Sequence, residues 1–154
     1  MAIWGSDATH IWITGEKGTA LYGDGSSWAQ VESGTTAKLR AVTGIDASHV
    51  WAAGEHTLLQ WEGTRWKVTK DDVDDDLVAA LAIDPTHVFA LGRGGSIWMW
   101  NGATWSRQRA KGTELLALAG EDLAHLYAVG DGALFLQFDG KSAWKKRPSP
   151  PSYF

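Results

Sequence analysis

The sequence contains no cysteine, only 4 prolines in 154 residues, and no long apolar run. The missing cysteines exclude disulfides, thiolate nucleophiles and cysteine-ligated zinc. A membrane-spanning helix needs roughly 20 consecutive apolar residues, and the N-terminal residues 1–7 lack both the basic region and the apolar core of a signal peptide. We therefore expect a soluble chain with no membrane span.

The chain also lacks an excess of positive charge. Lysine and arginine together number 14 against 18 aspartates and glutamates, which gives a net charge of −4. The basic residues form no extended stripe, so we do not expect nucleic acid as a partner. Two residue types are abundant instead, tryptophan with 10 copies and glycine with 18. This pairing favours short strands separated by tight turns.

Two short motifs recur four times in the same order along the chain. The first runs from an aspartate through a histidine and an aromatic residue to a glycine, and its copies span residues 7–15, 46–54, 84–92 and 122–130. Its closing glycines are 39, 38 and 38 residues apart. The second motif is an Asp, Glu or Asn, then glycine, then tryptophan, as in Asp24-Gly25-Ser26-Ser27-Trp28. Two motifs that keep register through four copies indicate tandem repeats.

Each repeat is predicted to be one four-stranded sheet. In the second copy, runs rich in β-branched and aromatic residues predict strands A to D at 39–44, 49–53, 58–61 and 65–69. Four antiparallel strands in about 40 residues is the size of a propeller blade. We therefore predict an all-β protein, a β-propeller of four tandem four-stranded antiparallel blades. The predicted blades are 1–37, 38–76, 77–114 and 115–147, followed by a C-terminal tail at 148–154. An open stack or a small barrel is the competing all-β arrangement.

A single blade cannot bury both of its faces, so we expect the blades to stack. The expected stacking layer comes from alternating positions of strand B and from one tryptophan of strand D in each copy: Ile11, Val50, Val88 and Leu126, then Trp12, Trp51, Phe89 and Tyr127, then Trp28, Trp66, Trp105 and Trp144. Strand A places an alanine in every copy at the crowded centre. The first copy departs from the pattern at Gly23, where the other copies carry an aromatic residue.

The segment from Val50 to Gly54, followed by the turn from Trp61 to Trp66, resembles the Trp-rich propeller repeats of bacterial extracellular and lipid-anchored proteins. The resemblance covers the whole chain and implies a β-propeller, but it is nearly silent on activity. A weaker similarity links the same turn to fucose-binding propeller lectins. Where those lectins are expected to hold a sugar-binding Arg and Glu, this chain has apolar residues such as Val50 and Leu58.

No catalytic residue, metal site or cofactor is predicted. Four Asp-x-x-His pairs invite a catalytic or metal interpretation, but a pair that occurs in every copy is typical of a structural turn, in which the aspartate caps backbone N–H groups. The acidic run at 71–76 does not match a calcium-binding loop, and we expect it to be solvated. The next equivalent connection is basic, with Arg107, Arg109 and Lys111, so the two loops could pair.

The residues that differ between copies are predicted to form the binding site. The loops between strands B and C and between D and A share one face of a propeller, and binding residues are drawn disproportionately from variable loops on a rigid scaffold. We predict a non-enzymatic binding or scaffolding propeller whose protein or glycan ligand contacts this face, through Glu16, Lys17, Glu55, His56, Arg93 and Asp131. The alternatives are a lectin that uses inter-blade tryptophans and a structural fragment of a longer propeller with no ligand of its own.

Four blades is the smallest number in the known range of four to eight. The chain could close as a four-bladed ring, or two chains could close an eight-bladed ring as a homodimer. We favour the homodimer because wide aromatic blades suit larger rings. The first repeat begins abruptly at residue 1, which is compatible with an extracellular or periplasmic piece of a longer precursor, and the compartment stays open.

Overall fold

The computed structural model of the chain describes residues 1–109 and 111–148. It contains four antiparallel sheets of four strands each, so the predicted four-bladed fold is confirmed. The strands are β1 (Ala2–Asp7), β2 (His10–Thr14), β3 (Ala20–Gly23) and β4 (Trp28–Gln30) in blade 1; β5 (Leu39–Asp46), β6 (His49–Gly54), β7 (Thr57–Trp61) and β8 (Trp66–Lys70) in blade 2; β9 (Leu77–Asp84), β10 (His87–Gly92), β11 (Ile97–Trp100) and β12 (Trp105–Arg109) in blade 3; and β13 (Leu115–Gly120), β14 (Leu126–Gly130), β15 (Leu134–Phe138) and β16 (Trp144–Lys146) in blade 4.

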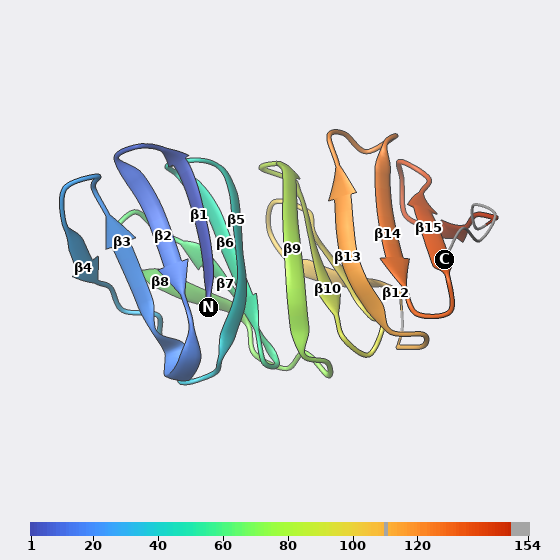
Figure 1. Cartoon of the computed structure of the whole chain (residues 1–154), viewed down its shortest axis with the longest axis horizontal. Helices are drawn as coiled ribbons and strands as arrows, with labels where there is room; N and C mark the ends of the chain where they lie inside the picture. The colour runs from blue at the N-terminus through green and yellow to red at the C-terminus, as the bar shows by residue number, and fades with distance from the viewer. Residues whose placement is uncertain (110, 149–154) are drawn as a thin grey trace.

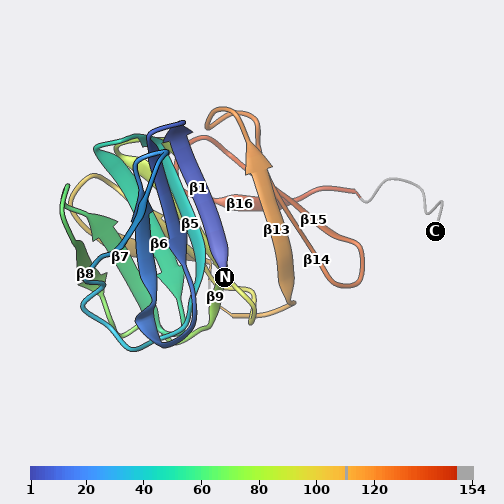
Figure 2. The ribbon, with the colours of Figure 1, turned by 60° about the vertical axis from the view of Figure 1, so that its left-hand side comes forward.

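Every sheet is a simple meander of four consecutive strands. The first strand of each blade, β1, β5, β9 or β13, lies beside the first strand of the next blade. Figure 1 shows the four blades in a row, with blade 1 and blade 4 at opposite ends. In Figure 2, β5 to β8 extend to one side and β13 to β15 to the other, so the sheets fan out from their inner edges. The described residues therefore form an open arc of a propeller rather than a closed four-bladed ring.

Three apolar clusters hold the blades together, one at each blade-to-blade contact. We call the sheet surface that meets the following blade the forward face and the surface that meets the preceding blade the rear face. The forward face of blade 2 contributes Trp51 and Ala53, which pack with Val88 and Ala90 from the rear face of blade 3. The predicted stacking layer is thus correct at the internal contacts. Ile11, Trp28 and Tyr127 are the members of the layer that meet no other described blade, and Trp28 is 51% exposed.

The irregularity at Gly23 has a local cause. Gly23 pairs with Trp28 across the β3–β4 hairpin, and a Cβ at position 23 would lie 2.7 Å from the Trp28 ring. The tryptophan therefore covers the glycine, as an aromatic residue does when it rescues a glycine in a sheet. Tyr22, one residue earlier, points to the other surface and stacks on Trp61 of blade 2, with ring centroids 5.9 Å apart.

The acidic run at 71–76 is only partly the solvated loop that we predicted. Asp75 is 5% exposed and Val73 is 2% exposed, so both are buried. The prediction was wrong at these positions because this part of the acidic run is buried and anchors the loop. Asp74 does pair with Arg107, since its Oδ1 lies 2.7 Å from Nη2 of Arg107, but Arg107 and Arg109 lie in strand β12 and not in the connection where we predicted them.

One short 3-10 helix, η1 (Glu16–Gly18), lies between β2 and β3. Within the described residues, no helix has the length and apolar character needed to cross a membrane.

Candidate functional site

The turns between the first and second strands carry the four Asp-x-x-His pairs. In every blade an aspartate oxygen accepts a hydrogen bond of 2.8 Å from the backbone N–H two residues later. The histidine Nδ1 of the same turn lies 2.8 to 3.0 Å from the aspartate oxygens. The repeated pair is therefore a turn that is closed on itself, as the sequence indicated, and its histidines are already engaged.

These turns shift the titration of their own groups. The hydrogen bond from His125 lowers the pKa of Asp122, and the bond to Asp122 raises the pKa of His125. Asp139, in the hairpin turn between β15 and β16, accepts bonds from the N–H groups of Ala143, Ser142 and Lys141, which lower its pKa to about 2. Depressed carboxyl pKa values add stability above the unfolded-state value of about 4, and this stability is lost as the pH falls through the folded-state values.

We expect the substitution Asp122→Asn to lower the pKa of His125 toward the unperturbed value of about 6.5. The reason is that the carboxylate is the main group that stabilises the protonated imidazole. An NMR titration of the histidine ring signals measures this shift. The matched control is Asp139→Asn, which removes a carboxylate from the same blade and should leave His125 unchanged. A His125 pKa that is equal in both variants would contradict the assignment.

Glu121, Asp122 and His125 offer ligand atoms within 4.8 Å of one another. All three residues are exposed, and Asp122 already accepts bonds from Ala124 N and from the backbone and ring of His125. The hydrogen bonds of the turn therefore account for the close approach of these three described side chains.

The loops between the second and third strands lie at the opposite ends of the sheets from these turns, and they carry all six predicted site residues. Glu16 forms an ion pair with Lys38, and the Oε1 of Glu55 lies 2.7 Å from Nη2 of Arg40. Both glutamates are therefore paired with residues at the start of blade 2. The pKa of Glu16 is lowered by its bond from Lys38.

His56 is held from two sides. Its Nδ1–H donates to the carbonyl oxygen of Val73 over 2.8 Å, and its Nε2 lies 3.6 Å from Oδ1 of Asp76. The side chain is nevertheless 62% exposed. His56 can therefore present an imidazole edge to a ligand from a fixed orientation.

Lys17, Arg93 and Asp131 are exposed. The backbone N–H of Arg93 donates to Asp76 O and that of Asp131 donates to Glu114 O, so both loop positions are fixed by the main chain. Lys17 has a φ of 51°, in the left-handed region. His56 and Ala133 share this conformation in the corresponding loops, with φ of 57° and 58°. A left-handed residue that recurs at the same loop is a feature of the turn, and it could not be predicted from the sequence because lysine, histidine and alanine rarely adopt this conformation.

The structure brings three of the six residues, Lys17, Glu55 and His56, to two adjoining hollows. Residues 34–36, in the connection from blade 1 to blade 2, separate two adjoining hollows on the loop face. Lys17 lines one hollow, of about 650 Å³, together with Ser33. Glu55 and His56 line the other, of about 460 Å³, together with Asp71. Gly34, Thr35 and Thr36 border both hollows. Glu16, Arg93 and Asp131 do not line either hollow.

The D–A loops belonged to the predicted binding face, but no residue of the connection at 31–38 was predicted for the site. This connection is pinned to blade 1, because Gly18 N donates to Ala37 O and Leu39 N donates to Gly15 O. A Cβ at Gly18 would lie 1.9 Å from Thr35 O, so a glycine is required for this close approach. The spacing of the repeats did not mark this connection, because Trp28 and Ala41 are as far apart in the sequence as Trp66 and Ala79.

Most of the tryptophans between the blades are buried, and Trp4 and Trp144 are half-buried there. Trp12, Trp51, Trp66, Trp98 and Trp105 are each at most 8% exposed. Trp28 is the most exposed tryptophan in the described ranges, and it belongs to none of the three clusters between the blades.

No protein-family model matches the chain, and no curated protein sequence matches it. The chain is similar in structure to YCF48 from Cyanidioschyzon merolae, with a TM-score of 0.69 at 17% identity, over 99% of this chain and 57% of that one. It is also similar to the structure described as YCF48 bound to D1 peptide, with a TM-score of 0.67 at 17% identity, over 95% of this chain and 53% of that one. The chain thus spans little more than half the length of these structures, and the likeness establishes a shared propeller fold.

Proposed function

We propose that the chain is a non-enzymatic, protein-binding part of a β-propeller that takes an extended peptide on its B–C and D–A loop face. The observation that carries the proposal is the pair of hollows beside residues 34–36, which gather Lys17, Glu55 and His56 from two blades. The structurally similar YCF48 bound to D1 peptide supports a peptide as the class of ligand.

The chemistry of the hollows fits a polar main chain better than an apolar anchor. Their linings combine hydroxyl groups of Thr35 and Thr36 with the carboxylates of Glu55 and Asp71 and the imidazole of His56. Such groups can bind peptide N–H and C=O groups and a basic side chain of the ligand. Arg93 and Asp131 continue the exposed polar face over blades 3 and 4, where an extended peptide would next pass.

Selection of displayed random peptides on the immobilised chain tests this proposal. We expect selected peptides to lose about tenfold or more in affinity, or about 1.4 kcal/mol, with Lys17→Ala, His56→Asn or Arg93→Ala. Asparagine suits position 56 because it tolerates the left-handed backbone and can still donate to Val73 O. The matched control is Lys141→Ala, which removes an exposed lysine from the opposite turn face. Peptides that depend on Lys141 and not on the loop-face residues would overturn the site.

The lectin alternative has less support, because most of the inter-blade tryptophans of this chain are buried. Specific binding on a glycan array, lost with a substitution at Trp28, would favour it over a peptide. Blades beyond these four would complete the rim of the loop face, and a homodimer is our candidate for supplying them.

A further inference from the structure

Blade 1 leaves an apolar surface uncovered at one end of the row. Its rear face is formed by residues that the β1–β2–β3–β4 register places on one side of the sheet: Ile3, Ile11, Ile13, Leu21 and Trp28. Ile3 is 65% exposed and Trp28 is 51% exposed. In blade 2 the equivalent positions are Val42, Val50, Ala52, Leu59 and Trp66, and all five are buried in the cluster between blades 1 and 2.

Blade 4 leaves the complementary surface uncovered at the other end. Its forward face is formed by Ala117, Ala119, Tyr127, Val129 and Phe135. Val129 is 43% exposed, and Tyr127 stacks on Phe135 with centroids 5.6 Å apart. The equivalent residues of blade 2 are buried, and four of them, Ala41, Trp51, Ala53 and Leu58, lie in the cluster with blade 3.

The two end faces are therefore the two halves of the contact that this chain already makes three times internally. We propose that the forward face of blade 4 packs on the rear face of blade 1 of a second copy, and that the reciprocal contact closes an eight-bladed ring. Two head-to-tail contacts related by a two-fold axis close without leaving a free end. Eight blades lie within the range that propellers form.

Specific contacts predict what the closing interface contains. At the contact of blades 3 and 4, Trp144 meets Phe89 edge-on with centroids 5.9 Å apart. At the contact of blades 2 and 3, the indole N–H of Trp105 donates to Thr69 over 3.0 Å. The repeat places Tyr127 at the position of Phe89 and Arg147 at that of Thr69. In the ring, Trp28 of the second copy would therefore lie against Tyr127 and Arg147.

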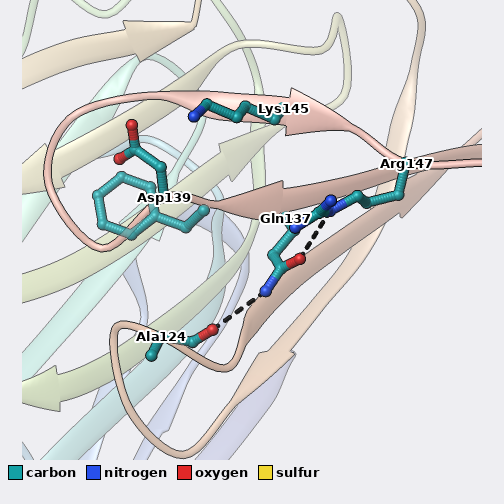
Figure 3. Close-up of a pocket in the computed structure, with 6 residues that line it drawn as sticks. Ala124, Gln137, Asp139, Lys145 and Arg147 are labelled. Carbon is teal, nitrogen blue, oxygen red and sulfur yellow. Dashed lines mark hydrogen bonds between the residues drawn. The ribbon is translucent and has the colours of Figure 1, made fainter.

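A hollow of about 280 Å³ lies at this end of blade 4, lined in part by Gln137, Lys145 and Arg147. Figure 3 shows Arg147 beside Gln137, with Arg147 Nε donating to Gln137 Oε1 over 2.7 Å. This bond orients the guanidinium of Arg147, an exposed residue, and an indole face packed on it would form a favourable cation–π contact. The chain already uses this chemistry, since Lys70 and Arg107 both lie 5.0 Å from the ring centre of Trp98.

Sedimentation equilibrium or light scattering of the purified chain tests the proposal. We expect a mass of twice 16.7 kDa for the unmodified chain. The substitutions Ile3→Glu and Val129→Glu should each shift the mass to that of a monomer, because a carboxylate would be buried against an apolar face. Ile45→Glu, at a position 38% exposed near the end of β5, is the control and should remain a dimer.

Mixing the two variants separates loss of the contact from loss of folding, because only two folded chains can restore it. In a head-to-tail ring, the Ile3→Glu chain keeps an intact blade 4 and the Val129→Glu chain keeps an intact blade 1. The mixture should therefore regain a dimer that neither variant forms alone. A monomeric unmodified chain, or an open-ended polymer, would overturn the closed homodimer. A monomer would point to blades of another chain or of a longer precursor as what covers the end faces.

Discussion

Replacing Trp51 with alanine is expected to destabilise the chain by about 3 to 5 kcal/mol, the usual range when a large aromatic side chain is removed from a core. Trp51 is 1% exposed and fills the contact between blades 2 and 3, together with Val88, Ala90 and Trp98. It also stacks on His49, with centroids 6.3 Å apart. The loss would open a cavity at the middle of the row, where neither sheet can shift without disturbing its other neighbour.

Urea unfolding followed by far-UV circular dichroism, at one fixed protein concentration, measures this effect. Trp51→Phe is the graded variant, since blade 3 carries Phe89 at the equivalent position, and it should lose much less. Ile45→Ala, at an exposed position of the same blade, should change the free energy of unfolding by no more than about 0.5 kcal/mol. Equal losses for Trp51→Ala and Ile45→Ala would show that the blade contact does not determine stability.

The second large effect is expected at Asp75, where alanine should destabilise the chain by about 3 kcal/mol. The Asp75 carboxylate is buried and accepts hydrogen bonds from Gly94 N at 2.9 Å, from Ser96 N at 3.2 Å and from Ser96 Oγ at 2.8 Å. It therefore ties the connection that precedes blade 3 to the loop between β10 and β11. Alanine would leave these buried donors without their acceptor.

Two variants separate this contact from the charge of the acidic run. Asp75→Asn keeps one carbonyl acceptor in place and should lose less than alanine. Asp72→Ala removes a neighbouring carboxylate whose side chain is 77% exposed, so its effect should stay within about 0.5 kcal/mol. If Asp72→Ala and Asp75→Ala were equally destabilising, the loss would come from charge and not from the anchored loop.

The blades could be predicted from the sequence because repetition reports which positions matter for packing. Residues such as Trp51 and Phe89 recur at fixed spacing, and the turn aspartates recur with their histidines, so both the stacking layer and the turn were evident. Asp75 could not be found in this way. It lies in a run of like residues without period, and only the loop at Gly94 and Ser96, about 20 residues later, distinguishes it from its neighbours.

The sequence could predict which face of the propeller carries the candidate site, but not which part of that face. Variation between copies indicated the loops that carry Lys17, Glu55 and His56. It could not indicate that Glu16 is engaged with Lys38, because that pair depends on how blade 1 sits on blade 2, or that Glu55 is engaged with Arg40 within blade 2. The hollows beside Thr35 also depend on how blade 1 packs on blade 2, since they form at the connection between these two blades.

Each sheet in the described part of the chain consists of four consecutive strands, and none of these strands joins the sheet of a neighbouring blade. A duplication or deletion of one repeat at the level of the gene would therefore add or remove a whole blade without cutting a sheet. The hydrogen-bonded strand pairs of the described residues join consecutive strands, so strand pairing within one blade need not wait for synthesis of the next. A change in the number of blades per chain would alter the angle that each blade occupies in a ring, and with it the number of copies that can close the ring.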